Sequence, residues 1–283
     1  MAKIAVFLEM IKFKFTVFAL PFALAGAFLA ARGLPGMMIF FWIVMAMVGA
    51  RTSAMAFNRI ADKRFDGDNP RTSRRALPTG EVSGRQAWFL TIGAALLFFF
   101  AAWQLNPLAL RVSPFALALI WGYSYTKRFT VLCHLILGAC LAIAPLGGWV
   151  AVLGELGGYP WSLSFGVIFW VAGFDTIYSC LDSSYDREAG LFSLPSRLGV
   201  PGALRVAAGF HLLAFACFIL TGWACRLHWL YYLLLIIAAA ALWYQHHVVK
   251  PEDLSRMHLA FQTMNSAISV VIFCAVCLAL AAG

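Results

Sequence analysis

Charged side chains are scarce in this sequence, and acidic ones are the scarcest. Only 12% of its 283 residues are charged, with 12 Asp and Glu against 21 Lys and Arg, whereas 63% are hydrophobic. Soluble domains carry roughly 25% charged residues, so this composition excludes an ordinary soluble fold. The mean hydropathy of +0.84 is instead typical of helices that cross a lipid bilayer.

Cysteine also forms no informative pattern. The chain has seven cysteines, an odd number, and most fall inside apolar runs. Cys274 and Cys277 form a CxxC pair, but no histidine or second pair stands nearby to complete a zinc site. We therefore interpret the cysteines as small packing residues and expect no disulfide framework.

The apolar runs predict an all-α integral membrane protein that forms one domain over residues 1–283. Each run has about 20 residues, the length that a helix needs to span a bilayer. Nine such spans are predicted, near residues 13–32, 37–57, 86–104, 107–125, 130–152, 162–181, 203–222, 227–245 and 261–282.

Basic residues are distributed unevenly between the loops on the two sides. With the N-terminus in the cytoplasm, the outer loops receive only Arg32, Arg111 and Arg226. This positive-inside bias predicts the orientation, and it accounts for the net charge of +9 without a nucleic-acid partner. We expect the protein in the cell inner membrane, with the segments after the second and sixth spans on the cytoplasmic side.

The few acidic residues are concentrated in two clusters that repeat one pattern. Each cluster has polar residues at i, i+4 and i+8: Asn58, Asp62 and Asp66 in the first, and Tyr178, Asp182 and Asp186 in the second. The same offset of 120 residues separates the corresponding aspartates. This spacing places each set on one face of a continuous helix.

Paired carboxylates one turn apart repel each other unless a cation lies between them. Mg²⁺ binds through one or two carboxylates and completes its shell with water and substrate phosphates. The two clusters therefore predict two Mg²⁺ sites, with catalytic importance for all four aspartates.

Basic residues stand near both clusters, in segments that the orientation places in the cytoplasm: Arg71, Arg74, Arg75, Lys127, Arg128 and Arg197. Such residues often anchor lipid headgroups, but their position beside paired carboxylates favours phosphate binding. Metals and cations together can take up the charge of a diphosphate leaving group. The pattern predicts a substrate with a diphosphate head and a hydrocarbon tail, whose carbocation is kept from water by apolar helices.

Arg51 is predicted to lie inside the second span, where a charge must face a polar cavity or an opposite charge. Two interpretations fit the sequence equally well. Either Arg51 faces a substrate, or it forms an ion pair with Asp175 of the sixth span. Tyr178, one turn after Asp175, is expected to offer an aromatic face to a carbocation.

These motifs resemble those of the UbiA-type intramembrane aromatic prenyltransferases. The NxxxDxxxD motif at 58–66, followed by RTSRRALPTG at 71–80, is similar to the first family signature. The segment 178–186 with its DxxxD is similar to the second, and Arg51 and the segment 123–130 also match family positions. The resemblance covers essentially the whole chain, and the paired motifs are highly specific.

The resemblance implies nine helices in a bundle around a central cavity, as two parallel-related four-helix halves plus one helix. It implies Mg²⁺-dependent transfer of a polyprenyl chain from polyprenyl diphosphate to a ring carbon of a small aromatic acid, in respiratory quinone biosynthesis. By this resemblance Asp62 and Asp66 hold one Mg²⁺, Asp182 and Asp186 hold the other, and Asn58 supports the diphosphate.

The acceptor implied by the family is usually 4-hydroxybenzoate. Three segments look closer to the branch that prenylates 1,4-dihydroxy-6-naphthoate for menaquinone: AMAFNRIADKRFDGDNPRT, SYTKRFTVLCHLILG and LFSLPSRLG. Either acid carries a carboxylate, for which Arg51 is the expected partner. In one departure from the family, many members have a Lys near Phe192, where Arg197 is the nearest cation here.

Other interpretations remain open at this point. A secondary transporter could use intramembrane acids, although the four aspartates fall at predicted helix ends rather than at the midplane. A related prenylation, of haem or a chlorophyll-type acceptor, and a non-catalytic scaffold are the remaining alternatives.

Overall fold

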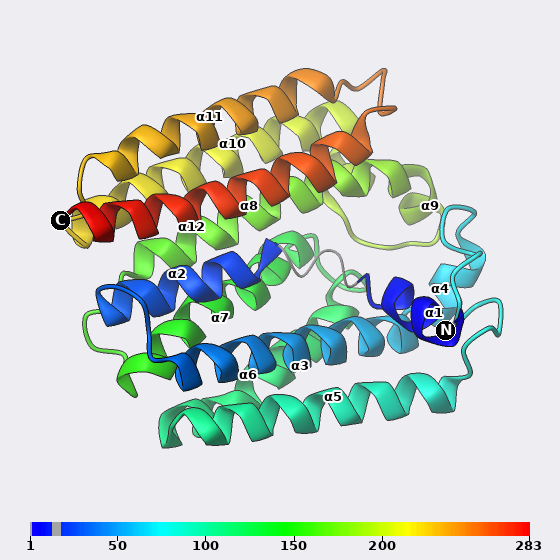
Figure 1. Cartoon of the computed structure of the whole chain (residues 1–283). Helices are drawn as coiled ribbons and strands as arrows, with labels where there is room; N and C mark the ends of the chain where they lie inside the picture. Colours follow the sequence, from blue (N-terminus) through cyan, green and yellow to red (C-terminus); the bar gives the residue numbers. More distant parts are fainter. Residues whose placement is uncertain (1, 13–17) are drawn as a thin grey trace.

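The computed structural model describes residues 2–12 and 18–283, and these residues form helices and no β-strand (Figure 1). The longer helices are α2 (Leu20–Ala31), α3 (Met37–Ala61), α5 (Gly84–Leu105), α6 (Pro107–Thr126), α7 (Cys133–Leu153), α8 (Trp161–Ser179), α10 (Leu194–Ala224), α11 (Leu230–Val248) and α12 (Asn265–Ala282). The shorter ones are α1 (Ala2–Met10), α4 (Lys63–Asp68), η2 (Cys180–Asp182), α9 (Ser183–Glu188) and the π-helical η3 (Leu259–Met264).

Side-chain caps begin three of the long helices. Ser83 at the start of α5 and Ser193 at the start of α10 each form a reciprocal capping box with the residue three positions later. Asn106 caps α6 by accepting a hydrogen bond from the backbone N–H of Ala109. These contacts satisfy N–H groups that have no partner inside the helix, so they fix where the helices begin.

Among the residues that the structure describes, six helical segments are long and apolar enough to cross a membrane: α3, α5, α7, α8 with η2 and α9, α10, and η3 with α12. Each of the nine predicted spans overlaps a helix, although residues 13–17 of the first lie outside the described part of the chain. Of the three other helices, α2 is shorter, α6 contains Arg111, and α11 ends in two histidines. The structure is thus that of an all-α integral membrane protein.

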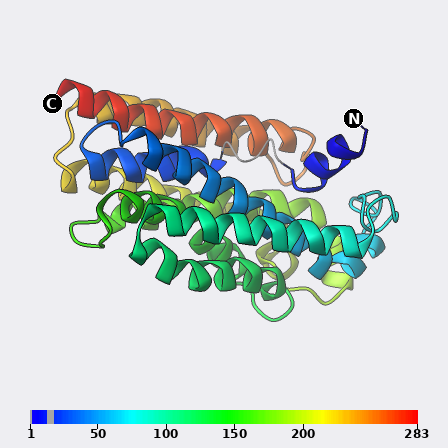
Figure 2. The same cartoon turned by 60° about the horizontal axis from the view of Figure 1, so that its bottom comes forward.

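The helices lie side by side in one bundle (Figures 1 and 2). α3, α5 and α6 form one side, and α8, α10, α11 and α12 form the other, with α2 and α7 between them. The short helices α4 and α9 lie at the same end of the bundle as α1 (Figure 1). This end therefore brings together the two segments that follow α3 and α8.

Neither acidic cluster lies on one continuous helix, which corrects the sequence prediction. α3 ends at Ala61 and α4 begins at Lys63, so Asp62 lies at a break with φ −96° and ψ 8°. Asp182 lies at the matching break before α9, with φ −107° and ψ 7°. The two halves thus repeat a break in the helix as well as a sequence pattern.

Glycines allow α2 and α7 to approach until their backbones touch. A Cβ atom at Gly148 of α7 would lie 1.9 Å from the carbonyl oxygen of Ala23 in α2. A Cβ atom at Gly26 of α2 would lie 2.0 Å from the carbonyl oxygen of Pro145 in α7. Since backbone cannot move aside cheaply, this helix pair is fixed by residues without side chains.

We predict that Gly148→Ala destabilises the protein by about 1–3 kcal/mol, because the added methyl group overpacks the α2–α7 contact. Gly147→Ala is the matched control, since a Cβ atom there has no neighbour within 4 Å. Thermal unfolding in detergent measures both variants. Equal unfolding temperatures for the two would show that the α2–α7 contact is not as tight as described.

Candidate active site

A cavity of about 700 Å³ lies inside the bundle and reaches the end where the acidic clusters meet. Most of its wall is apolar and comes from α3, α6 and α7, with a smaller contribution from α5. Its lining also includes all four cluster aspartates. The cavity is therefore apolar along its length and polar at one end.

Asp62 and Asp66, the aspartates of the first cluster, each contact a cation. Asp62 accepts a hydrogen bond from Asn58 Nδ2 at 2.8 Å and lies 3.4 Å from Arg128. Asp66 is buried, and its Oδ1 accepts a hydrogen bond from Arg75 at 2.6 Å. Its Oδ2 lies 3.5 Å from the buried guanidinium of Arg59.

Asp182 and Asp186, the aspartates of the second cluster, are buried as well. Arg71 donates to both oxygens of Asp182, through Nε at 2.8 Å and through a terminal nitrogen, and Asn69 donates to Oδ1 at 2.9 Å. For Asp186, Lys127 Nζ lies 2.8 Å from Oδ1, and the hydroxyl of Ser193 donates to Oδ2 at 2.8 Å.

These contacts join the two clusters across the mouth of the cavity. Arg71 and Asn69 follow the first cluster in sequence, yet both bind Asp182 of the second. Tyr185, beside the second cluster, donates to the backbone carbonyl oxygen of Phe65 in α4 at 2.9 Å. The two helix breaks are therefore held together by direct hydrogen bonds.

The charges at this end shift the pKa of groups that lie outside the long helices. Burial and the nearby Asp66 carboxylate raise the pKa of Asp62 above its ordinary value. Burial alone would lower the pKa of Lys127, but the contact with Asp186 offsets this effect and raises it. Lys127 therefore stays protonated, and Asp62 needs a positive partner to remain ionised.

The aspartates fit the requirements of a divalent cation that also needs substrate ligands. Oδ2 of Asp66 and Oδ1 of Asp186 are buried carboxylate oxygens that already attract a cation, Arg59 at 3.5 Å and Lys127 at 2.8 Å. Within the described part of the chain, no three His, Cys, Asp or Glu side chains converge into a complete cage. Mg²⁺ suits this donor set, because it takes one or two carboxylates and leaves positions for water and phosphate oxygens.

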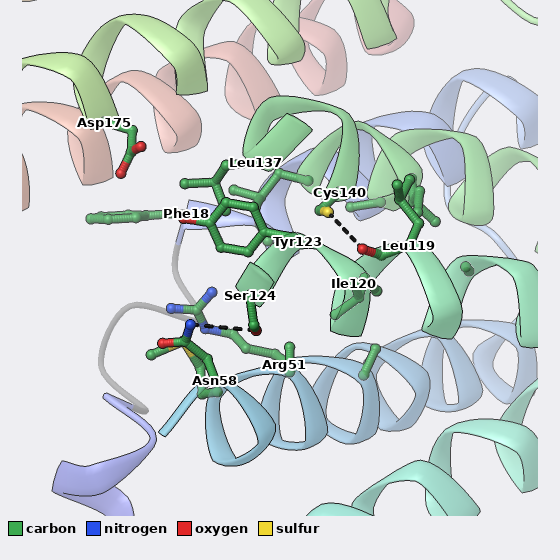
Figure 3. A pocket seen from close by; sticks show the side chains of 18 of the residues that line it. Phe18, Arg51, Asn58, Leu119, Ile120, Tyr123, Ser124, Leu137, Cys140 and Asp175 are labelled. Carbon is green, nitrogen blue, oxygen red and sulfur yellow. Dashed lines mark hydrogen bonds between the residues drawn. The ribbon is translucent and has the colours of Figure 1, made fainter. Parts of the chain in front are cut away.

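Arg51 lies in the wall of the cavity and does not pair with Asp175. Among the described residues it forms no ion pair, and its buried Nε donates no hydrogen bond. Figure 3 shows Arg51 and Asn58 extending from α3 on the side of Tyr123. Asp175 lies away from them and instead contacts His134 at 2.7 Å. The ion-pair interpretation of Arg51 is wrong.

Two predicted diphosphate-binding residues do not line the cavity. The guanidinium of Arg197 lies 4.4 Å above the ring of Phe192, and Arg74 is likewise absent from the cavity wall. Tyr178 does line it, with its ring stacked on Phe261 at 4.1 Å between centroids and its hydroxyl accepting from Arg71 at 3.1 Å.

Sequence reasoning did not single out four residues that contact the site aspartates: Arg59, Asn69, His134 and Ser193. Ser193 stands 120 residues after Ser73, the offset that also separates the aspartates, whereas Arg59, Asn69 and His134 have no such counterpart. Arg59 and Asn69 lie within or next to the first motif, and this nearness in sequence was the signal that could have marked them as site residues. His134 and Ser193 are brought to the aspartates only by helix packing.

The sequence pattern of the UbiA prenyltransferase family matches residues 19–269. A 4-hydroxybenzoate octaprenyltransferase of Nitrosospira multiformis is 30% identical over 253 residues, which cover 89% of this chain and 87% of that protein. The chain belongs to the UbiA prenyltransferase family. The predicted family is thereby confirmed, and a prenyltransferase is favoured over a transporter.

Solved structures of this family share the fold. A UbiA homolog from Aeropyrum pernix K1 is 36% identical with a TM-score of 0.86, over 93% of this chain and 97% of that one. A UbiA homolog from Archaeoglobus fulgidus bound to GPP and Mg²⁺ is 19% identical with a TM-score of 0.70, over 96% and 99%. The second likeness is one of fold alone.

Proposed function

We propose that this protein transfers a polyprenyl chain from polyprenyl diphosphate to a ring carbon of a small aromatic acid, in the biosynthesis of a respiratory quinone. One observation carries the proposal: two aspartate clusters are joined by Arg71 at the polar end of an apolar cavity. The cavity offers space for a hydrocarbon chain, and its polar end offers carboxylates and cations for a diphosphate.

Asp62 and Asp66 would hold one Mg²⁺, and Asp182 and Asp186 a second. Bound there, Mg²⁺ supplies positive charge that neutralises the carboxylates and stabilises the departing diphosphate. All four carboxylates line the polar end of the cavity, which supports this assignment. The solved homolog with GPP and Mg²⁺ is consistent with it.

The cations at the cavity mouth would bind the diphosphate oxygens. Arg71, Arg75, Lys127 and Arg128 each contact a cluster aspartate, so each lies within reach of a diphosphate held between the clusters. Charge-assisted hydrogen bonds from these groups strengthen as negative charge develops on the leaving group. Asn58 would add a neutral donor beside Asp62.

The apolar wall would protect the allylic carbocation that remains after the diphosphate leaves. Water is excluded by the aliphatic and aromatic lining, and the ring of Tyr178 faces the cavity close to the second cluster. An aromatic face attracts a cation through its quadrupole. The carbocation then persists until the ring of the acceptor attacks it.

For the acceptor we propose 4-hydroxybenzoate, the substrate that names the curated relatives. Arg51 would bind its carboxylate, because this half-buried residue lines the cavity and its buried Nε donates no hydrogen bond. The second candidate is 1,4-dihydroxy-6-naphthoate for menaquinone, favoured by the segments 54–72, 124–138 and 191–199. Both acids present the carboxylate that Arg51 requires.

In the membrane, we propose that all nine long helices cross the bilayer of the cell inner membrane as a single domain. α2, α3, α5 and α6 would form one half, α7, α8, α10 and α11 a parallel second half, and α12 the additional helix. The matching breaks at Asp62 and Asp182 support this duplication. The distribution of basic residues supports a cytoplasmic position for the aspartates.

We predict that Asp62→Asn or Asp186→Asn lowers release of diphosphate by at least about 10²-fold, because each removes a carboxylate that would hold Mg²⁺ beside the leaving group. Asp68→Asn is the matched control, since Asp68 lies in the same short helix as Asp66 but is exposed and does not line the cavity. Release of diphosphate from a polyprenyl diphosphate measures all three. Near-normal turnover in either site variant would remove the metal assignment.

We predict that Arg51→Leu raises the KM for 4-hydroxybenzoate by about 10- to 100-fold, the value of a charge-assisted hydrogen bond, with little change in the KM for the diphosphate. Arg51→Lys should recover part of the loss because it keeps the charge. 4-Hydroxybenzamide, which lacks the carboxylate charge, is the control substrate and should bind equally weakly to the wild-type protein and to Arg51→Leu. A similar increase in both KM values would assign Arg51 a structural role.

The acceptor is identified by offering membranes that contain the protein one polyprenyl diphosphate with each acid in turn. Preferential alkylation of 4-hydroxybenzoate is the expected result. Preferential alkylation of 1,4-dihydroxy-6-naphthoate would establish the second candidate, and alkylation of neither would contradict the proposed function.

A further inference from the structure

His134 of α7 is a buried histidine that joins three helices at the cavity wall. Its side chain is 2% exposed. Its Nδ1 lies 2.7 Å from Oδ2 of Asp175 in α8, and its Nε2 lies 3.2 Å from the backbone nitrogen of Leu194. Leu194 is the first residue of α10, directly after the cap Ser193 that binds Asp186.

The hydrogen-bond partners determine which nitrogen of His134 carries the proton. The backbone N–H of Leu194 is a donor only, and it has no partner inside its own helix because it belongs to the first turn. Nε2 of His134 must therefore accept this bond. The proton of the neutral imidazole then lies on Nδ1, which donates to Oδ2 of Asp175.

The hydrogen bond from His134 orients the carboxylate of Asp175 and occupies only its Oδ2. The side chain of Asp175 is 21% exposed, and the residue lines the cavity. No hydrogen bond within the described residues engages its Oδ1. A carboxylate oriented through one oxygen therefore presents the other to the cavity.

Asp175 lies at the depth where an acceptor ring would sit. It precedes Asp182 by two helical turns, or roughly 10 Å along α8. Arg51 precedes Asp62 by roughly 16 Å along α3. A ring whose carboxylate binds Arg51 therefore has Asp175 on the other side of the cavity, with Tyr123 between the two walls (Figure 3).

We propose that His134 is a positioning residue that holds Asp175 as the carboxylate accepting the ring proton of the alkylated acceptor. The inference rests on the proposed function. The bond between the allylic carbon and the diphosphate oxygen breaks, and a pair of ring π electrons forms the new C–C bond. The ring C–H bond then breaks, its electron pair restores aromaticity, and the proton passes to Oδ1 of Asp175. Water that enters the cavity after the products leave takes that proton.

A merely structural role for His134 makes a different prediction. If the histidine only ties α7, α8 and α10 together, its loss disturbs the whole site and lowers every step alike. If it positions a proton acceptor, its loss leaves cleavage of the diphosphate intact and impairs only completion of the alkylation. The two roles are separated by measuring diphosphate release and alkylated product in the same reaction.

The test compares the wild-type protein with His134→Leu, His134→Gln and Asp175→Asn, with polyprenyl diphosphate and 4-hydroxybenzoate. We expect His134→Leu and Asp175→Asn to lower alkylated product by about 10²-fold, a typical loss for a proton acceptor. Diphosphate release should fall far less, with the difference recovered as the free prenyl alcohol. His134→Gln should keep most of the product, because an amide can donate to Asp175 and accept from Leu194.

Ring-deuterated 4-hydroxybenzoate adds a readout that belongs to proton loss alone. A primary isotope effect on product formation should appear in His134→Leu and Asp175→Asn, because breaking the C–H bond becomes the slow step. Asp175→Asn keeps the size of the side chain, so the test stands even if His134→Leu fails to fold. Parallel loss of diphosphate release and product, or no isotope effect in Asp175→Asn, would overturn the inference. If the wild-type protein alkylates no acid at all, the proposed function fails as well.

Discussion

The hydrogen bonds from Arg71 to Asp182 are the interaction on which the rest of the site depends. Arg71 belongs to the segment after the first helix break, and Asp182 forms the second break, so this contact joins halves of the chain that are far apart in sequence. A bidentate guanidinium fixes the distance and the orientation of its partner. Without it, two acidic helix ends would repel each other at the mouth of the cavity.

Each carboxylate at the cavity mouth is balanced by a positively charged side chain. Burying a carboxylate is costly unless a cation or several donors accompany it, and each of the four cluster aspartates has such a partner. These partners are also the groups able to bind a diphosphate. The same residues thus stabilise the folded site and provide its chemistry, which links the stability of this end of the bundle to its function.

Much of the fold and part of the site could be predicted from the sequence. Apolar runs predict the helices because length and hydropathy are local properties, and the repeated DxxxD spacing predicts the metal pairs. The breaks at Asp62 and Asp182 could not be predicted, because a spacing of four residues fits a continuous helix equally well. The pairing of Asp175 with His134 rather than Arg51, and the stacking of Arg197 on Phe192, depend on helix packing, which local spacing does not encode.

The central claim is that both aspartate clusters bind one diphosphate together through two Mg²⁺ ions. The most direct test is calorimetric titration of the purified protein with a prenyl thiolodiphosphate, which binds without ionising, at controlled Mg²⁺ concentrations. The account predicts that binding requires Mg²⁺, that two ions bind with each analogue molecule, and that Asp62→Asn and Asp182→Asn each abolish tight binding. Equally tight binding of the analogue in the presence of a chelator, or loss of affinity in only one of the two variants, would contradict it.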